Sequence, residues 1–246
     1  GLGWFGKNTT LIHPERGSFF FLAEIFLGIE LVPDSPFESE HCGTCRRCID
    51  ACPTGSLKEP HTLDANLCIS YLTIELDEAI PKDLRPQMDS WIFGCDICQQ
   101  VCPWNQKFSE NNWIIEEFRS RPETTEVDLK EEMGLSEDEF REKFSGSAVK
   151  RTKRRGYLRN VAVALGNQGD KKALPVLEQA LRDHEPLVRE HAAWAVGQIG
   201  GNRAQAVLQG ALDQEKDAQV KVEIRSALRD LSESDGKPES GQDSGA

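Results

Sequence analysis

The chain has 246 residues, a formal net charge of −12 and 8 cysteines. Its length suits one large domain or two smaller ones, and its acidity excludes a uniformly cationic nucleic-acid-binding protein. So many thiols need a reducing compartment, which predicts a cytoplasmic location. The most apolar stretch, residues 19–32, contains two glutamates and is too short to cross a bilayer. We expect it to be a core strand or helix, with no membrane partner.

Residues 1–38 are rich in Gly, Phe, Leu and Ile and are predicted to be the end of a mixed α/β domain. The chain starts at Gly1, within a glycine-rich motif and without a methionine, so we expect a fragment that lacks its N-terminal part. Gly1, Gly3 and Gly6 have the G-x-G-x-x-G spacing of dinucleotide-binding loops. This signal is weak, because such a triplet alone more often marks a tight turn.

Residues 39–108 contain every cysteine of the chain and form a predicted cluster module. The first run is C-x2-C-x2-C-x3-C, closed by Pro53, and it is typical of bacterial ferredoxins with two 4Fe–4S clusters. Two-residue gaps let consecutive thiolates converge on one cluster, whereas the last cysteine of the run ligates the other cluster. The second run, C-x2-C-x3-C closed by Pro103, lacks the first member, and Cys68 is left over.

This crossing rule assigns all the thiols to two 4Fe–4S clusters. The predicted ligands of cluster one are Cys42, Cys45, Cys48 and Cys102. The predicted ligands of cluster two are Cys52, Cys68, Cys95 and Cys98. Disulfides and four-sulfur zinc sites are the alternatives, of which zinc is the stronger. Neither explains the three-cysteine run or the Cys-Pro endings.

Residues 109–155 are a polar connector, in which Ser136 and Glu139 predict a capped helix start. The connector ends in a basic segment of five cations: Lys150, Arg151, Lys153, Arg154 and Arg155. In an acidic protein such a segment is a natural contact for phosphates, although a solvated linker is an equal alternative. Further cations, Arg159, Arg182 and Arg189, would extend the patch if helix packing placed them on one side.

Residues 156–231 repeat themselves at a shift of 31 residues, because 160–166 match 191–197 and 173–181 match 204–212. A third copy starts near Glu223. Each unit predicts two amphipathic helices that stack on their neighbours, as in HEAT-type repeats. We expect Gly166 and Gly197 to end the first helix of their units. Residues 232–246 are rich in Ser, Gly, Asp and Glu and are predicted to be a disordered tail.

Several motifs together resemble the epoxyqueuosine reductase family. They include Gly1-Leu-Gly-Trp-Phe-Gly-Lys-Asn8, Cys42-Gly-Thr-Cys45, Cys68-Ile-Ser-Tyr-Leu-Thr-Ile-Glu75, Phe93-Gly-Cys-Asp96, Cys102-Pro-Trp-Asn105 and Arg151-Thr-Lys-Arg154. The resemblance runs from residue 1 to about residue 231. It implies an α+β fold: the end of a cobalamin-binding α/β domain, a ferredoxin-like module and a HEAT-like helical domain. It also implies the last step of queuosine biosynthesis, the reduction of epoxyqueuosine to queuosine in the anticodon loop of tRNA.

The resemblance further implies that an external donor, which the sequence does not identify, passes electrons through the two clusters to cobalamin. The residues it places at cobalamin are Lys7, Asn8, Leu11, Leu22, Ser70 and Asp96. Simpler roles exist for these positions: a core contact for the leucines, an ion pair for Lys7 and a helix cap for Asp96. The family's general-acid aspartate is expected upstream of Gly1. We therefore expect no catalytic residue in this chain and no turnover by the chain alone.

The implied substrate gives the basic segment a role, because tRNA phosphates would bind Lys150, Arg151, Lys153, Arg154 and Arg155. Trp104 and Trp113 are aromatics that either stack on a base or, more commonly, lie in a core. A monomer is expected. Two other functions compete: a reductive dehalogenase-like cobalamin enzyme acting on a small molecule, and a ferredoxin-type electron carrier. Neither explains every motif, because the first leaves the basic segment and the repeats without a purpose.

Overall fold

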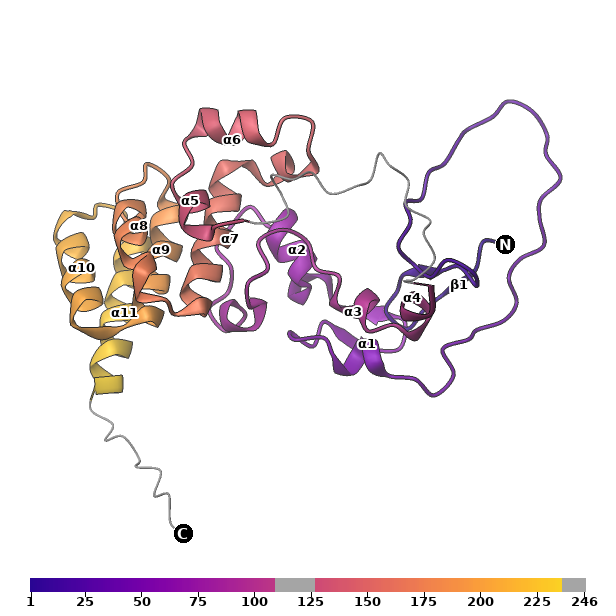
Figure 1. Cartoon of the computed structure of the whole chain (residues 1–246), viewed down its shortest axis with the longest axis horizontal. Coiled ribbons are helices and arrows are strands. Elements are labelled where there is room, and N and C mark those ends of the chain that lie inside the picture. The colour runs from indigo at the N-terminus through magenta and orange to yellow at the C-terminus, as the bar shows by residue number, and fades with distance from the viewer. Residues whose placement is uncertain (109–126, 236–246) are drawn as a thin grey trace, which may run out of the picture. The chain divides into compact units, whose positions relative to one another are not determined.

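The computed structural model of the chain describes residues 1–108 and 127–235. These residues form two compact units, coloured along the chain in Figure 1. Of the described residues, unit 1 contains 1–71 and 95–108. Unit 2 contains 72–94 and 127–235. The segment 72–94, which separates the two cysteine runs, therefore belongs to the helical unit. The expected module 39–108 is in this respect not one compact body.

Unit 1 is built from short elements joined by turns. Its two antiparallel hairpins pair β1 (Trp4–Phe5) with β2 (Leu11–Ile12) and β3 (Leu57–Glu59) with β4 (Thr62–Leu63). Its helices are α1 (Arg47–Asp50), α3 (Ile97–Gln100) and α4 (Pro103–Phe108), with a 3₁₀ turn at Ala65–Leu67. Helix α2 (Ile69–Ile74) follows Cys68 and continues into unit 2.

The apolar residues 19–32 differ from the expectation of a core strand or helix. They form no regular element, and their side chains are exposed apart from the half-buried Phe20, up to 93% for Phe26 and 95% for Val32. The physical reason is that an apolar strand or helix needs an apolar surface to pack on, and the described part of the chain offers this run none. Within residues 1–38, the described regular elements are β1 and β2.

Unit 2 is helical in its described part. Its longer helices are α7 (Lys153–Gln168), α9 (Pro186–Ile199), α10 (Gly201–Gln214) and α11 (Ala218–Asp235). Its shorter helices are α5 (Leu129–Met133), α6 (Glu137–Lys143) and α8 (Leu174–Ala180), with 3₁₀ turns at Arg85–Met88, Ala148–Thr152 and Lys171–Ala173. The capping box at Ser136 and Glu139 is confirmed, because each side chain binds the backbone N–H of the other residue.

The matched helices α7, α9 and α11 stack side by side (Figure 1). The sequence predicted that Gly166 and Gly197 end helices, and this prediction is wrong, because both lie inside them. α7 ends at Gly169, which adopts φ 65°, and α9 ends at Gly200, with φ 73°. A Cβ atom on Gly166 would lie 2.9 Å from the Cα of Ala195 in α9, and one on Gly197 would lie 2.8 Å from the Cβ of Ala227 in α11. The repeated glycine is therefore a close-packing position between neighbouring first helices.

Helix α11 continues to Asp235, past residue 232, where the tail was expected to begin. Residues 236–246 lie outside the described part, and so does Trp113. Among the described residues, no helix combines the length and apolarity that a membrane crossing requires.

Candidate metal centres and nucleic-acid interface

A cavity of about 130 Å³ in unit 1 brings together the four thiols predicted for cluster one. Its lining residues are Cys42, Cys45, Cys48, Cys102, Lys7, Asn8, Ile12, His41, Arg47, Pro103 and Trp104. The burial of Cys48 raises its pKa, and repulsion from Cys42 and Cys102 adds to this shift. Three thiols from two distant runs therefore interact electrostatically at one site.

The thiols predicted for cluster two also interact with one another. Burial raises the pKa of Cys98 to about 12, with further repulsion from Cys95, Cys68, Cys48 and Cys52. For Cys95 burial is again the largest cause of a raised pKa, followed among the thiols by Cys68 and Cys52. Because these electrostatic effects fall with distance, the four thiols of the predicted set lie near one another.

Cys52 differs from these thiols in having a lowered pKa. Burial alone would raise it, but hydrogen bonds from Ser56, the Leu57 backbone and Thr54 outweigh burial. The sulfur lies 3.1 Å from the Ser56 hydroxyl oxygen and 3.8 Å from that of Thr54. These contacts favour the thiolate, which is the form that ligates iron.

The two cysteine runs fold in the same local geometry. Arg46 and Asp96, the residues before α1 and α3, have nearly the same backbone angles, φ −128° and ψ 7° against φ −115° and ψ 13°. Each helix closes on its last cysteine, because Cys52 N–H donates to Ile49 and Cys102 N–H donates to Gln99. Helices α1 and α3 pack against each other. Two like runs face one another, which is the arrangement that crossed ligation requires.

All eight cysteines are free thiols. The described residues contain no group of three His, Cys, Asp or Glu side chains arranged to hold one metal ion. A 4Fe–4S cluster needs a different arrangement from a single metal ion, because each of its four thiolates binds a separate iron atom. Two predicted sets of four thiols are the donor set that two 4Fe–4S clusters require.

Lys7 and Asn8, predicted at cobalamin, contact the cysteine runs. The Lys7 ammonium donates to the carbonyl oxygens of Gly43 and Cys45, the latter at 3.0 Å, and among the described residues it pairs with these carbonyls and not with a carboxylate. The buried Asn8 amide donates to the Cys98 carbonyl oxygen at 3.4 Å. Both residues therefore line the cluster-one cavity.

The other residues predicted at cobalamin are spread over unit 1. Leu11 is half-buried in β2, and Leu22 is 63% exposed in the segment without regular structure. Ser70 is half-buried in α2. Asp96 is exposed at the start of α3, where it accepts a hydrogen bond from Gln99 and makes no side-chain cap.

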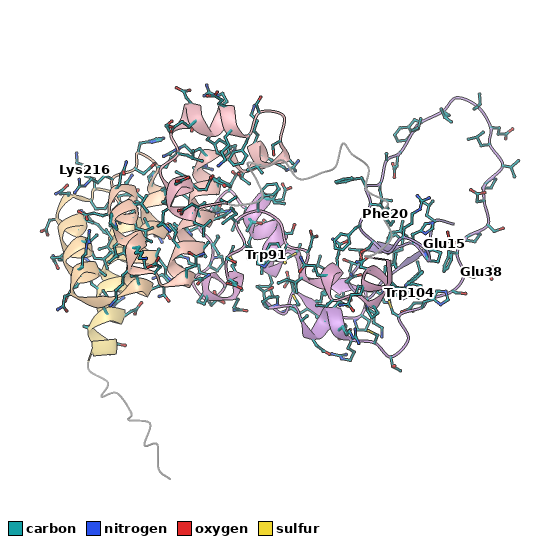
Figure 2. All side chains as sticks on the ribbon, in the orientation of Figure 1. Glu15, Phe20, Glu38, Trp91, Trp104 and Lys216 are labelled. Carbon is teal, nitrogen blue, oxygen red and sulfur yellow. The ribbon has the colours of Figure 1, made fainter. Side chains whose placement is uncertain are left out.

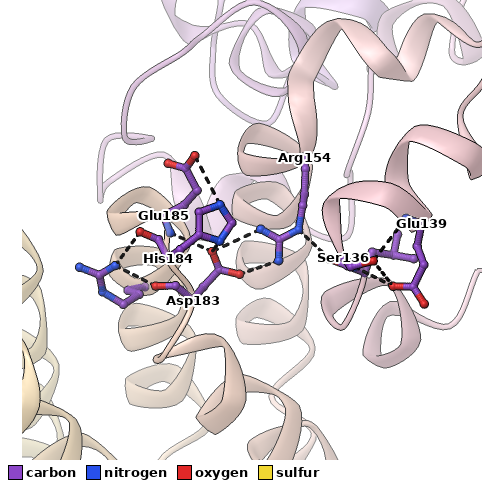
Figure 3. A network of polar contacts seen from close by, with 8 residues as sticks. Ser136, Glu139, Arg154, Asp183, His184 and Glu185 are labelled. Atoms are coloured by element: carbon purple, nitrogen blue, oxygen red, sulfur yellow. Dashed lines mark hydrogen bonds and ion pairs between the residues drawn. The ribbon is translucent and has the colours of Figure 1, made fainter.

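The basic segment divides into exposed cations and one buried cation. Arg154 is 7% exposed, and its guanidinium donates to Asp183 at 3.3 and 2.6 Å and to the Leu135 carbonyl oxygen at 2.6 Å (Figure 3). This is a correction to the predicted phosphate contact, because a buried guanidinium that is bound on two sides has no face left for RNA.

The other cations of the segment, Lys150, Arg151, Lys153 and Arg155, keep surface exposure. Carboxylates of segment 72–94 hold most of them. Arg151 pairs with Glu75 at 2.8 Å, and Lys153 and Arg155 each lie 3.4 Å from Asp77. Exposed pairs of this kind exchange readily, so phosphates can compete for these cations.

The expected extension of the patch by further arginines is not found. Arg159 is completely buried, and Arg189 is bound in two places by Glu215, at 2.7 and 3.0 Å. Arg182 is exposed and pairs with Glu178 in the preceding turn. The exposed cations of the basic segment are thus not continued by these three side chains.

Trp104 lies at the start of α4 (Figure 2). Its ring packs edge-on against Trp4 with centroids 4.9 Å apart, and it lies 5.6 Å from the ring of His41. Lys107 covers the ring at 5.3 Å. Trp104 therefore belongs to an aromatic cluster beside the cluster-one cavity, which is the core role that the sequence favoured over base stacking.

Sequence reasoning missed a set of buried polar residues in unit 2. Asn160 is completely buried and donates to the carbonyl oxygens of Thr73 and Ile92, at 2.8 and 2.9 Å. His191 is completely buried as well and accepts from the Ile80 backbone N–H at 3.1 Å. A polar residue at the same place in consecutive repeats was the available signal.

Comparisons with known proteins agree with these two parts. A model of the 4Fe-4S double cluster binding domain matches residues 41–105, and a model of HEAT repeats matches residues 151–229. The epoxyqueuosine reductase of Xanthomonas campestris is 47% identical over 201 residues, covering 81% of this chain and 56% of the relative. That of Escherichia coli K12 is 47% identical over 199 residues, covering 80% and 52%.

A crystal structure of an epoxyqueuosine reductase with an epoxyqueuosine-modified tRNA-Tyr stem loop is similar to the whole fold. Its TM-score is 0.88 at 37% identity, over 94% of this chain and 61% of that one. The chain spans about half the length of the curated relatives it matches.

Proposed function

The chain belongs to the epoxyqueuosine reductase family, and from this premise we propose that it serves the reduction of epoxyqueuosine to queuosine in tRNA. The observation that carries the proposal is the pairing of two sets of four thiols with a HEAT-repeat unit that presents exposed cations. A ferredoxin-type carrier would account for the thiols alone, and a small-molecule dehalogenase would leave the repeats and cations without a purpose.

The thiols hold two 4Fe–4S clusters by crossed ligation in this proposal. Cluster one binds Cys42, Cys45, Cys48 and Cys102, and its support is the cavity that these four thiols line. Cluster two binds Cys52, Cys68, Cys95 and Cys98, and its support is their mutual electrostatic effect. Since Cys98 also interacts with Cys48, the two clusters would be close enough to pass electrons.

Anaerobic reconstitution with iron and sulfide tests the ligand assignment. The chain should bind about eight irons and eight sulfides, and Cys102→Ser should perturb only cluster one while Cys52→Ser perturbs only cluster two. Electron paramagnetic resonance of the reduced chain separates the two signals. Stoichiometric zinc without labile sulfide, or loss of the same signal in both variants, would contradict the assignment.

Cobalamin is the proposed electron acceptor, on the strength of the family's motifs. When bound, it supplies a strongly reducing cobalt for attack on the epoxide carbon. The residues of this chain proposed for its contact are Lys7, Asn8, Leu11, Leu22, Ser70 and Asp96. Of these, Lys7 and Asn8 line the cluster-one cavity. The task of the chain's own residues is to hold the clusters and exclude water from them.

The substrate proposal concerns the exposed cations. Lys150, Arg151, Lys153 and Arg155 would bind phosphates of the tRNA, which positions the RNA without reading its sequence. Their support is surface exposure next to the repeats. The similar epoxyqueuosine reductase structure that holds an epoxyqueuosine-modified tRNA stem loop agrees with this substrate class.

Binding of an epoxyqueuosine-containing stem loop at several salt concentrations tests this part. Replacing Arg151, Lys153 and Arg155 by Ala should weaken binding and reduce the salt slope by about three, since each phosphate contact contributes about one unit. Lys171 and Lys172, exposed after the far end of α7, are matched controls. Their replacement should leave the slope unchanged, and an equal effect of both sets would argue against the proposed interface.

A further inference from the structure

The segment between the cysteine runs, residues 72–94, is held by the first helices of all the repeats. Asn160 in α7 binds Thr73 and Ile92, His191 in α9 binds Ile80, and Glu223 in α11 pairs with Lys82 and Arg85. Asn160 and His191 are equivalent at the shift of 31 residues, and Glu223, 32 residues after His191, lies near the start of the third copy. Buried polar side chains near the same place in successive repeats thus bind this segment at several points along its length.

Asn160 is the anchor nearest to both cysteines that flank the segment. Its amide nitrogen bridges two carbonyl oxygens, of Thr73 at 2.8 Å and of Ile92 at 2.9 Å. Thr73 belongs to α2, which starts directly after Cys68, and Ile92 lies three residues before Cys95. A single side chain therefore binds both backbone segments that lead to two of the predicted cluster-two thiols, one from Cys68 and one to Cys95.

Arg159 fixes the orientation of this amide. Its guanidinium donates twice to the Asn160 side-chain oxygen, at 3.0 and 2.9 Å, and to the carbonyl oxygens of Leu72, Leu76 and Glu78 at 2.6 Å each. With its oxygen occupied by Arg159, the Asn160 amide must direct its nitrogen toward the segment. The guanidinium also satisfies carbonyl groups at the C-terminal end of α2.

A third contact joins the two ends of the segment directly. The backbone N–H of Gly94, directly before Cys95, donates to the Thr73 hydroxyl at 3.0 Å. Thr73 is completely buried. The contacts of Asn160 and Thr73 hold α2 and Gly94 at a fixed separation, and the chain leaves these points toward Cys68 and Cys95.

We propose that Asn160 is a positioning residue for cluster two, which sets the spacing between Cys68 and Cys95 from within the helical repeats. The proposal rests on the cluster-two ligand assignment made above. It gives the repeats a second task besides the contact with RNA, because α7, which contains part of the basic segment, also binds the backbone between the two cysteine runs.

The test compares Asn160→Ala with Asn167→Ala in the reconstituted chain. Asn167 is a matched control, because it lies in the same helix and also donates two hydrogen bonds to the segment, to the carbonyl oxygens of Arg85 and Asp89, each further along the chain from the flanking cysteines than Thr73 and Ile92 are. Asn160→Ala should lower the iron content from about eight toward about four, or shift the resonance signal and midpoint potential of cluster two alone. Asn167→Ala should retain both clusters with unchanged spectra.

If Asn160→Ala does not fold, Thr73→Val is a second variant of nearly unchanged shape. It removes the hydroxyl that accepts from the Gly94 N–H and should perturb the same cluster. Circular dichroism confirms that the repeats are folded. Unchanged cluster-two signals in folded Asn160→Ala, or equal changes in both asparagine variants, would overturn the positioning role. A wild-type chain without two clusters would instead refute the ligand assignment itself.

Discussion

Arg154 and Asp183 form a buried ion pair between α7 and the loop after α8, with both terminal nitrogens of the guanidinium, Nη1 and Nη2, bound to the carboxylate (Figure 3). The side chains are only 8% and 10% exposed. Asp183 also accepts from the Glu185 backbone N–H at 2.9 Å, so the pair orders the loop that leads into α9. The most basic segment of the chain therefore contributes one of its cations to the fold.

Replacing Arg154 by Ala should destabilise unit 2 by about 3–5 kcal/mol, because it leaves Asp183 buried without its partner. Chemical denaturation measures this loss. Arg151→Ala is the control, since its pair with Glu75 is exposed and its removal should leave the denaturation midpoint nearly unchanged. Equal midpoints for both variants would show that the Arg154 pair does not stabilise the repeats.

The glycines of the repeats should respond to alanine in opposite directions. Gly166→Ala places a Cβ atom 2.7 Å from the Trp194 ring, and such overpacking costs about 1–3 kcal/mol. Gly210→Ala in α10 meets no atom within 4 Å and should stabilise the protein by about 0.5–1 kcal/mol, because alanine favours the helix. Thermal unfolding of the two variants checks the sign. A stabilising Gly166→Ala would refute the close-packing role.

His191 should make unit 2 sensitive to mild acid. Burial lowers its pKa well below 6.5, and the cations Arg85 and Arg159 repel its protonated form. Its Nδ1 bonds to the Leu187 carbonyl oxygen and its Nε2 accepts from Ile80, which fixes the neutral ring. The unfolded state therefore binds the extra proton, so stability is complete above about pH 6.5 and falls as the pH decreases below it.

The measurement for His191 is denaturant unfolding between pH 7.5 and 5.5. The wild type should lose up to about 1.4 kcal/mol per pH unit below the unfolded pKa of this group. His191→Gln should be less stable throughout but flatter over this range. A variant with the same pH slope as the wild type would assign the acid sensitivity to other groups.

Asp77 should oppose RNA binding, because it holds Lys153 and Arg155. Asp77→Asn should tighten the binding of a tRNA stem loop about two- to fivefold at low salt, with the advantage disappearing at high salt. Asp170→Asn, at the far end of α7, removes one charge elsewhere and is the control. The same gain in both variants would indicate a general charge effect instead of local competition.

The sequence was most informative where function requires a fixed spacing. The cysteine runs predicted the four thiols that line one cavity, and the Ser136 capping box follows a local rule that needs no tertiary partner. The sequence was less informative where the partner is distant. The role of Arg154 depends on Asp183, the role of Gly166 depends on Ala195, and the location of segment 72–94 depends on buried polar side chains in helices that follow it. Spacing along the chain does not encode such encounters.

Segment 72–94 also limits how this protein can be rearranged. A chain shortened to residues 1–108 would keep every thiol but would expose Ile80, Leu84 and Met88, which are buried in unit 2. It would also lose the side chains that bind the backbone of the segment. The repeats are therefore not an interchangeable attachment. Grafting a different helical domain after the second cysteine run would require a redesigned connection between Cys68 and Cys95, so metal centre and repeats are expected to be inherited together.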